Sequence, residues 1–223
     1  VQDVECFSKL LEKRHKIKIS GATNSGKTTL LKYLYCHVIG SKVPLYFSIE
    51  NKAKINTNTF IKRLFEEEYG NSPDLFAKYQ QLDKSEKILF VDGIDNICGA
   101  LSQATLLQKI EENFQYIIIS TNSGQQSSIV DTIKNSMSDE NSYYELHIKP
   151  FYTEKRNELV RNICVQKDTY NDSEINIVNK LIDSLVQNNS ALFSLNPDFI
   201  IRYTNYFIQD PYHDYTKGEA VFS

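Results

Sequence analysis

A segment near the start of the chain has the residue types and the spacing of a phosphate-binding loop. Residues 21–28 read Gly-Ala-Thr-Asn-Ser-Gly-Lys-Thr, which fits the pattern G-x-x-x-x-G-K-[S/T] in full. The glycines let successive backbone N–H groups turn toward phosphate oxygens, and the helix that follows directs its positive end at the same anion. This pattern predicts a nucleotide site. The residues expected to bind the nucleotide here are Gly21, Asn24, Ser25, Gly26, Lys27, Thr28 and Thr29.

Two side chains of this loop have a direct role in phosphate chemistry. Lys27 supplies a mobile cation for the β- and γ-phosphates of a nucleotide, which makes it a candidate catalytic residue as well as a binding residue. The Thr28 hydroxyl is a ligand for Mg²⁺. A strand pattern precedes the loop and an amphipathic helix pattern follows it. This context favours a true phosphate site over a chance glycine turn.

An aspartate follows an apolar segment further along the chain. Residues 88–92 read Ile-Leu-Phe-Val-Asp. A buried strand of this kind places its final carboxylate at the carboxyl edge of the sheet, where open α/β folds bind their ligands. There Asp92 can hold the water shell of Mg²⁺ beside Thr28. Asp92 is therefore a candidate metal ligand and a candidate catalytic residue.

Two further polar residues lie where they could act on an attacking water molecule. Asp95 comes three residues after Asp92 and can orient or deprotonate water, or it can cap a helix that begins after it. Asn122 follows the strand pattern of residues 115–120 and can contact the γ-phosphate or the attacking water, or it can simply open a loop. Both are candidate catalytic residues, and the sequence leaves both alternatives open.

The sequence also bears on the base of the nucleotide. A guanine-specific site would show the pattern Asn-Lys-x-Asp after a strand. The nearest segment, Gln-Lys-Asp at residues 166–168, lies within or just after a predicted helix and lacks that pattern. Adenine is therefore favoured, and ATP with Mg²⁺ is the expected cofactor.

Strand and helix patterns alternate along the first two thirds of the chain. The strand patterns are short and apolar, whereas the helix patterns have apolar residues three and four positions apart. Such alternation predicts the α/β class, here a P-loop NTPase whose parallel sheet is covered by helices on both faces. The expected strands are residues 16–20, 43–50, 87–91, 115–120 and 142–148, and the expected helices are residues 28–38, 59–69 and 101–113.

The pattern changes after Pro150, beyond which no strand is predicted. We therefore expect a P-loop core over residues 1–150 and a small helical lid over residues 151–223. Proline is well tolerated at the first position of a helix, so Pro197 is expected near the start of the last helix. The expected helices of the lid are residues 153–165, 172–186 and 197–207.

Composition limits the classes of partner. The chain has 223 residues, of which 25 are basic and 28 acidic, for a formal net charge of -3. This balance makes nucleic acid an unexpected partner, and no apolar run reaches the ~18–20 residues of a membrane span. The four scattered cysteines have no metal-ligand spacing and are typical of the cytoplasm. Because the chain begins at Val1 rather than methionine, we expect it to be a piece of a longer protein.

Taken together, the phosphate loop, residues 88–96 and the helical tail resemble the STAND class of P-loop NTPases, relatives of AAA+ proteins that include the NACHT and NB-ARC groups. The stretch Leu-Phe-Val-Asp-Gly-Ile-Asp-Asn at residues 89–96 is similar to the apolar strand, aspartate, small residue, apolar residue and second acid of that class. Asn196 and Pro197 resemble the G-x-P segment of the class lid. The resemblance implies that Pro197 contacts the adenine.

Three positions depart from the pattern of this class. Asn96 stands where the class usually has Glu, Asn122 stands where many members have Arg, and Leu195 replaces the Gly of G-x-P. These departures leave ATP binding as the expectation, and they predict slow hydrolysis.

The resemblance implies an ATP-dependent conformational switch, such as the central module of a bacterial antiviral defence sensor. Such a module forms homo-oligomers when other regions sense a protein ligand. An alternative is an AAA+-type ATPase that handles DNA, as an initiator or loader does. A third and weaker alternative is a small-molecule kinase, which Arg156 and Arg161 leave open.

Overall fold

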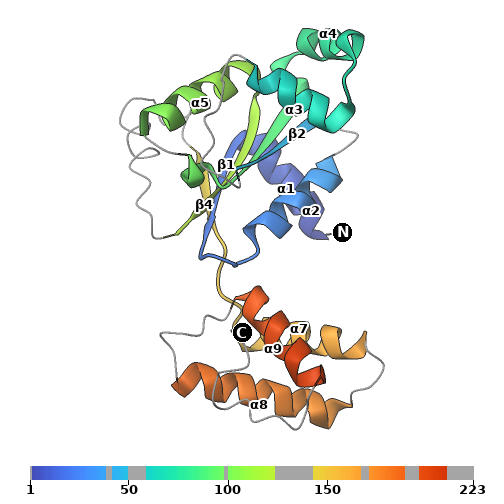
Figure 1. Cartoon of the computed structure of the whole chain (residues 1–223), viewed down its shortest axis with the longest axis vertical. Helices are drawn as coiled ribbons and strands as arrows, with labels where there is room; N and C mark the ends of the chain where they lie inside the picture. Colours follow the sequence, from blue (N-terminus) through green and yellow to red (C-terminus); the bar gives the residue numbers. More distant parts are fainter. Residues whose placement is uncertain are drawn as a thin grey trace. The chain divides into compact units, whose positions relative to one another are not determined.

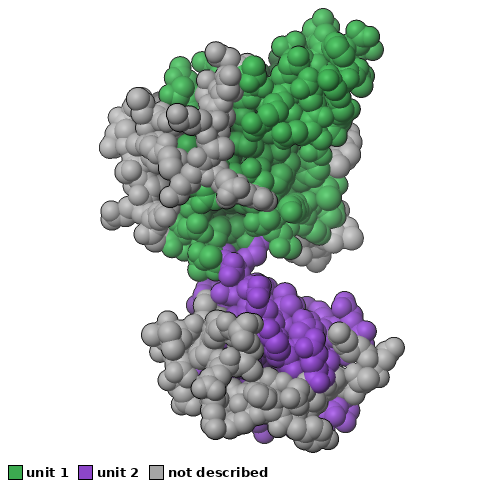
Figure 2. Space-filling model, viewed as in Figure 1, with its two compact units in different colours: residues 1–23, 27–148 green, residues 24–26, 149–223 purple. Residues whose placement is uncertain are grey.

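The computed structural model of the protein describes residues 2–38, 42–49, 59–97, 100–123, 143–166, 171–188 and 196–209. The chain divides into two compact units (Figure 2). The first unit comprises residues 1–23 and 27–148, and the second comprises residues 24–26 and 149–223. The long part of the second unit thus starts one residue before Pro150, where the sequence pattern changes.

Among the described residues, five parallel strands form the sheet of the first unit (Figure 1). The order of the strands is β2-β3-β4-β1-β5. Strand β4 therefore lies between β1, which leads into the phosphate loop, and β3, which ends in Asp92. The strands are β1 Lys16–Gly21, β2 Val43–Ser48, β3 Lys87–Asp92, β4 Tyr116–Asn122 and β5 Tyr144–His147.

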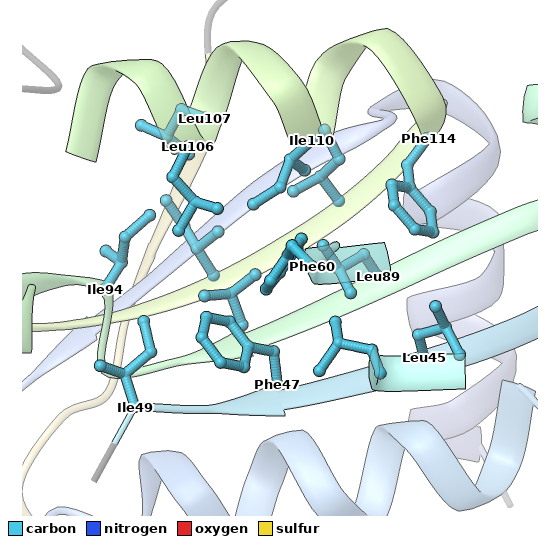
Figure 3. Packing of buried hydrophobic residues seen from close by; sticks show 14 of the residues in the cluster. Leu45, Phe47, Ile49, Phe60, Leu89, Ile94, Leu106, Leu107, Ile110 and Phe114 are labelled. Atoms are coloured by element: carbon cyan, nitrogen blue, oxygen red, sulfur yellow. The ribbon is translucent and has the colours of Figure 1, made fainter. Parts of the chain in front are cut away.

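Helices cover both faces of this sheet and confirm the predicted α/β class (Figure 1). The apolar run of β3 is continuous because its successive side chains point to opposite faces of the sheet, and helices cover both faces. Ile88 and Phe90 pack in the core under α1 and α2, whereas Leu89 and Val91 pack in the core under α3, α4 and α5. Figure 3 shows Leu89 in the second of these cores. These helices are α1 Gln2–Lys13, α2 Lys27–Val38, α3 Phe60–Tyr69, α4 Pro73–Gln81 and α5 Ala100–Asn113.

The predicted elements of this unit are all present, with ends that differ by at most two residues, but four further elements were not predicted. These are the helices α1 and α4 and the 3-10 turns η1 Lys84–Glu86 and η2 Ile94–Asn96. The start of α4 does carry a local signal, since the Ser72 hydroxyl accepts a hydrogen bond from the backbone N–H of Leu75 at 3.4 Å and Pro73 follows it.

The described part of the second unit consists of helices α7 Thr153–Val165, α8 Asp172–Asn188 and α9 Pro197–Gln209, as predicted apart from the ends of α8 and α9. Val160, Val178 and Tyr203 are fully buried, one from each helix, so the three helices share one apolar core. None of the described helices in either unit is long and apolar enough to cross a membrane.

Candidate nucleotide-binding site

The phosphate loop lies between the end of β1 and the start of α2. Its backbone turns sharply, because Asn24 and Gly26 adopt the left-handed region with φ of 59° and 94°. The Lys27 ammonium donates hydrogen bonds to the carbonyl oxygens of Gly21 at 3.0 Å and Ala22 at 2.7 Å. The side chain of Lys27 therefore folds back over the loop itself, where phosphate oxygens could replace these carbonyls.

The loop also offers groups that fit an anion. Within the described residues, the Ser25 hydroxyl is buried without a hydrogen-bond partner, although buried hydroxyls nearly always have one. Thr28 and Thr29 lie exposed in the first turn of α2, at the positive end of the helix dipole. A buried hydroxyl, an ammonium and a helix N-terminus together fit the phosphate groups of a nucleotide.

Carboxylates lie close enough to Lys27 to influence its charge. Burial lowers the pKa of Lys27 from its ordinary value, and the negative charges of Asp95 and Asp92 oppose this shift. The structure thus brings a cation from the start of α2 and two acids from the end of β3 and the turn after it to the same edge of the sheet.

Asp92 ends β3 and is buried, with only 8% of its surface exposed. Its Oδ1 accepts a hydrogen bond from the Ser120 hydroxyl at 2.5 Å, and its Oδ2 accepts one from the Tyr46 hydroxyl at 3.2 Å. Among the described residues, no group of three His, Cys, Asp or Glu side chains could hold a metal by itself. A Mg²⁺ ion at this position would therefore need phosphate oxygens and water in addition to Thr28 and Asp92, as is usual for Mg²⁺.

Asp95 and Asn122 are directly bonded to each other. Asp95 Oδ2 accepts hydrogen bonds from the side-chain amide of Asn122 at 2.8 Å and from its backbone N–H at 3.1 Å. Asp95 Oδ1 is buried and has no hydrogen-bond partner within the described residues. It is an acceptor that a water molecule could use, so the pair can bind and orient water beside the phosphate loop.

The alternative interpretation of Asp95 as a helix cap is wrong. Asp95 lies in the middle of η2, whose N-cap is Gly93, and α5 begins only at Ala100. Asn122 does end its strand, but it also bonds to the acid.

The turn after β3 explains two features of the sequence. Gly93 adopts φ +75°, and a Cβ at this position would lie 2.7 Å from the side-chain nitrogen of Asn96, so a larger residue is disfavoured. The same nitrogen of Asn96 donates to the carbonyl oxygen of Ile49 at 2.8 Å. Where STAND proteins usually have Glu, Asn96 therefore holds the turn against the end of β2.

Tyr46 and Ser120 contact Asp92, but the sequence analysis did not select them as site residues. Tyr46 lies on β2, whose position beside β3 could not be read from the sequence. Ser120 occupies the end of an apolar strand, where a polar residue that is completely buried signals a specific partner.

Pro197, the remaining predicted site residue, is the first residue of α9 in the second unit. The Asn196 side chain caps this helix, because its Oδ1 accepts a hydrogen bond from the backbone N–H of Phe199 at 2.9 Å. The predicted helix start is therefore confirmed, and the contact between Pro197 and adenine stays a prediction.

A parallel sheet with a phosphate loop after β1, an aspartate after β3 and a polar residue after the intervening β4 defines an AAA+-type P-loop NTPase fold. The chain belongs to the AAA domain family, which matches residues 13–154. No curated protein matches the sequence.

Solved structures of AAA+ proteins share this fold. Domain III of the replication initiation protein DnaA from Thermotoga maritima is 16% identical, with a TM-score of 0.54 over 99% of this chain and 88% of that one. DnaA bound to AMPPCP and single-stranded DNA is 14% identical, with a TM-score of 0.59 over 97% of this chain and 63% of that one. Hsp104 with ATPγS and FITC casein is 13% identical, with a TM-score of 0.57 over 95% of this chain and 38% of that one. At these identities the likeness shows the fold.

Proposed function

We propose that this chain is the ATPase module of an AAA+ protein, which binds ATP with Mg²⁺ and hydrolyses it. The observation that carries the proposal is the complete phosphate loop, in which the buried Ser25 hydroxyl has no partner among the described residues. The direct test is calorimetric titration with ATPγS, followed by measurement of phosphate release from ATP with and without Mg²⁺. A protein that neither binds ATPγS nor releases phosphate would overturn the proposal.

Each site residue has a role that follows from its contacts. Bound ATP with Mg²⁺ would supply the γ-phosphoryl group, which passes to water as its bond to the leaving ADP breaks. Lys27 would exchange its carbonyl partners in the loop for phosphate oxygens, and Thr28 and Asp92 would hold the metal and its water shell. Asp95 Oδ1 accepts a proton from water, while Asn122 fixes the orientation of that carboxylate.

We extend the proposal to the second unit, which we assign as a nucleotide lid over residues 151–223. A rigid proline ring at the start of α9 offers an apolar surface without an N–H donor to a flat base. We expect ATPγS to slow hydrogen exchange both in the phosphate loop and at the backbone amides of residues 198–200, with α8 as an internal reference. Protection confined to the phosphate loop would reject the lid and favour a nucleotide held by the first unit alone.

The nucleotide cycle has two candidate outputs, and we propose DNA handling ahead of signalling. The likeness to DnaA, one structure of which contains single-stranded DNA, supports this choice. Hsp104, whose structure contains FITC casein, has the same fold, so the choice between the two outputs is made by experiment. The kinase alternative loses its support, because Arg156 pairs with Asp183 and Arg161 pairs with Asp172 within the second unit.

Salt dependence separates the two outputs. We expect the ATPγS-bound protein to bind a fluorescent single-stranded oligonucleotide, with affinity that falls steeply between about 50 and 200 mM salt because phosphate contacts release counterions. Failure to bind DNA at the lowest salt, together with ATP-dependent self-association in sedimentation, would instead support the switch that the STAND resemblance implies.

A further inference from the structure

Three polar side chains form a row across three neighbouring strands. They are Tyr46 on β2, Asp92 on β3 and Ser120 on β4, and Asp92 lies in the middle. Tyr46 is opposite Phe90 in the sheet register, two residues before the aspartate. A tyrosine is long enough to reach such a diagonal neighbour on the same face of the sheet.

Each hydrogen bond in this row has a defined donor and acceptor. Ser120 Oγ accepts a hydrogen bond from the backbone N–H of Gly93 at 2.8 Å, so its own single proton is available for Asp92 Oδ1 at 2.5 Å. The Tyr46 hydroxyl donates to the other carboxylate oxygen at 3.2 Å. Each oxygen of Asp92 thus receives one hydroxyl donor, and the two donors come from opposite sides.

The ring of Tyr46 is held by the helix that begins with the phosphate-loop lysine. Tyr35 on α2 packs edge-on against Tyr46, with ring centroids 5.9 Å apart, and edge-on against Phe90 at 5.7 Å. Edge-to-face packing of this kind restricts where the ring can lie. The position of the Tyr46 hydroxyl is therefore set by contacts on α2 and β3.

We propose, on the basis of the proposed ATPase function, that Tyr46 and Ser120 are positioning residues that hold the Asp92 carboxylate in one orientation for Mg²⁺. An ionised carboxylate has about four lone-pair directions, of which the two hydroxyls use two. The rest stay available to the water shell of the metal. Without the two hydroxyls, the terminal torsion of Asp92 would have a broad range. Part of the free energy of Mg²⁺ binding would then be lost in fixing that torsion.

The test uses Tyr46→Phe, which keeps the ring and removes only the hydroxyl. Mg²⁺ is titrated by calorimetry into protein already saturated with ATPγS. We expect the Kd for Mg²⁺ to rise by about 10-fold, the lower end of the usual effect of losing a partner of a metal ligand. The affinity for ATPγS without Mg²⁺ should be unchanged, and the hydrolysis rate should recover at saturating Mg²⁺. Ser120→Ala should shift the Mg²⁺ titration in the same direction.

The matched control is Tyr69→Phe. The Tyr69 hydroxyl also forms a hydrogen bond with β2, because it donates to the carbonyl oxygen of Pro44 at 2.8 Å. It removes the same atom from a tyrosine at the end of α3, without touching Asp92, so its Mg²⁺ titration should match that of the unaltered protein. Unaltered Mg²⁺ affinity in Tyr46→Phe, with nucleotide binding intact, would overturn this inference alone. An unaltered protein that binds no nucleotide would overturn the proposed function and this inference with it.

Discussion

Lys27→Ala is expected to weaken ATP binding by at least about 30-fold, because removing one partner of a desolvated charge pair costs about 2–5 kcal/mol. The Lys27 ammonium is the basic side chain of the phosphate loop, and it already lies over the loop through its bonds to Gly21 and Ala22. Its loss leaves the β- and γ-phosphate charge without a cation from the protein. Calorimetric titration with a non-hydrolysable ATP analogue measures the effect.

The control for this substitution is Lys32→Ala, which removes the same charge from an exposed position one turn further along α2. Its affinity for the analogue should match that of the unaltered protein. If Lys27→Ala bound the analogue as tightly as Lys32→Ala did, the phosphate-loop assignment would be wrong.

Asp95→Asn is expected to slow ATP hydrolysis by about 10²- to 10⁴-fold, the usual contribution of a general base, and to leave ATP binding nearly intact. The asparagine oxygen can replace Asp95 Oδ2 and accept both hydrogen bonds from Asn122. The amide nitrogen then occupies the place of Oδ1, the buried oxygen without a partner among the described residues, and it cannot accept a proton from water. Single-turnover hydrolysis and ATPγS binding, measured in parallel, separate the two effects.

Asp74→Asn, at an exposed position of α4, controls for the loss of one carboxylate from the first unit. Hydrolysis by Asp95→Asn at the rate of this control would mean that Asp95 only holds Asn122 in place.

The parallel sheet and the phosphate loop could be predicted because both depend on local sequence. The run Ile88 to Val91 identifies a strand buried on both faces, and the loop pattern is contiguous. The strand order could not be predicted, because the placement of β4 between β1 and β3 depends on long-range pairing. The missed helix α4 did carry a local signal, in the serine and proline at Ser72 and Pro73.

The candidate site also contains some residues that could be predicted from the sequence and others that could not. Asp92 and Asp95 were predicted from their distance to a strand end, and their electrostatic effect on Lys27 follows from the shared edge of the sheet. The bonds from Tyr46 and Ser120 to Asp92 join three strands whose register is a property of the folded sheet. The role of Asn96 was also hidden, because its partner is a backbone carbonyl at the end of another strand.

The pairing of β1 has a consequence for the order in which the protein is made. This strand comes first in the chain, yet its neighbours are β4, with Lys16 beside Ile117, and β5, with Ile17 beside Tyr144. The ribosome makes the chain from its N-terminus, so β1 must wait for β4 to emerge before it can join the sheet, and its second neighbour comes only with β5. The strand that leads into the nascent phosphate loop therefore has no neighbour in the sheet until β4 has been synthesised. Nucleotide binding measured on ribosome-bound chains of increasing length would show at which length the phosphate loop becomes able to bind.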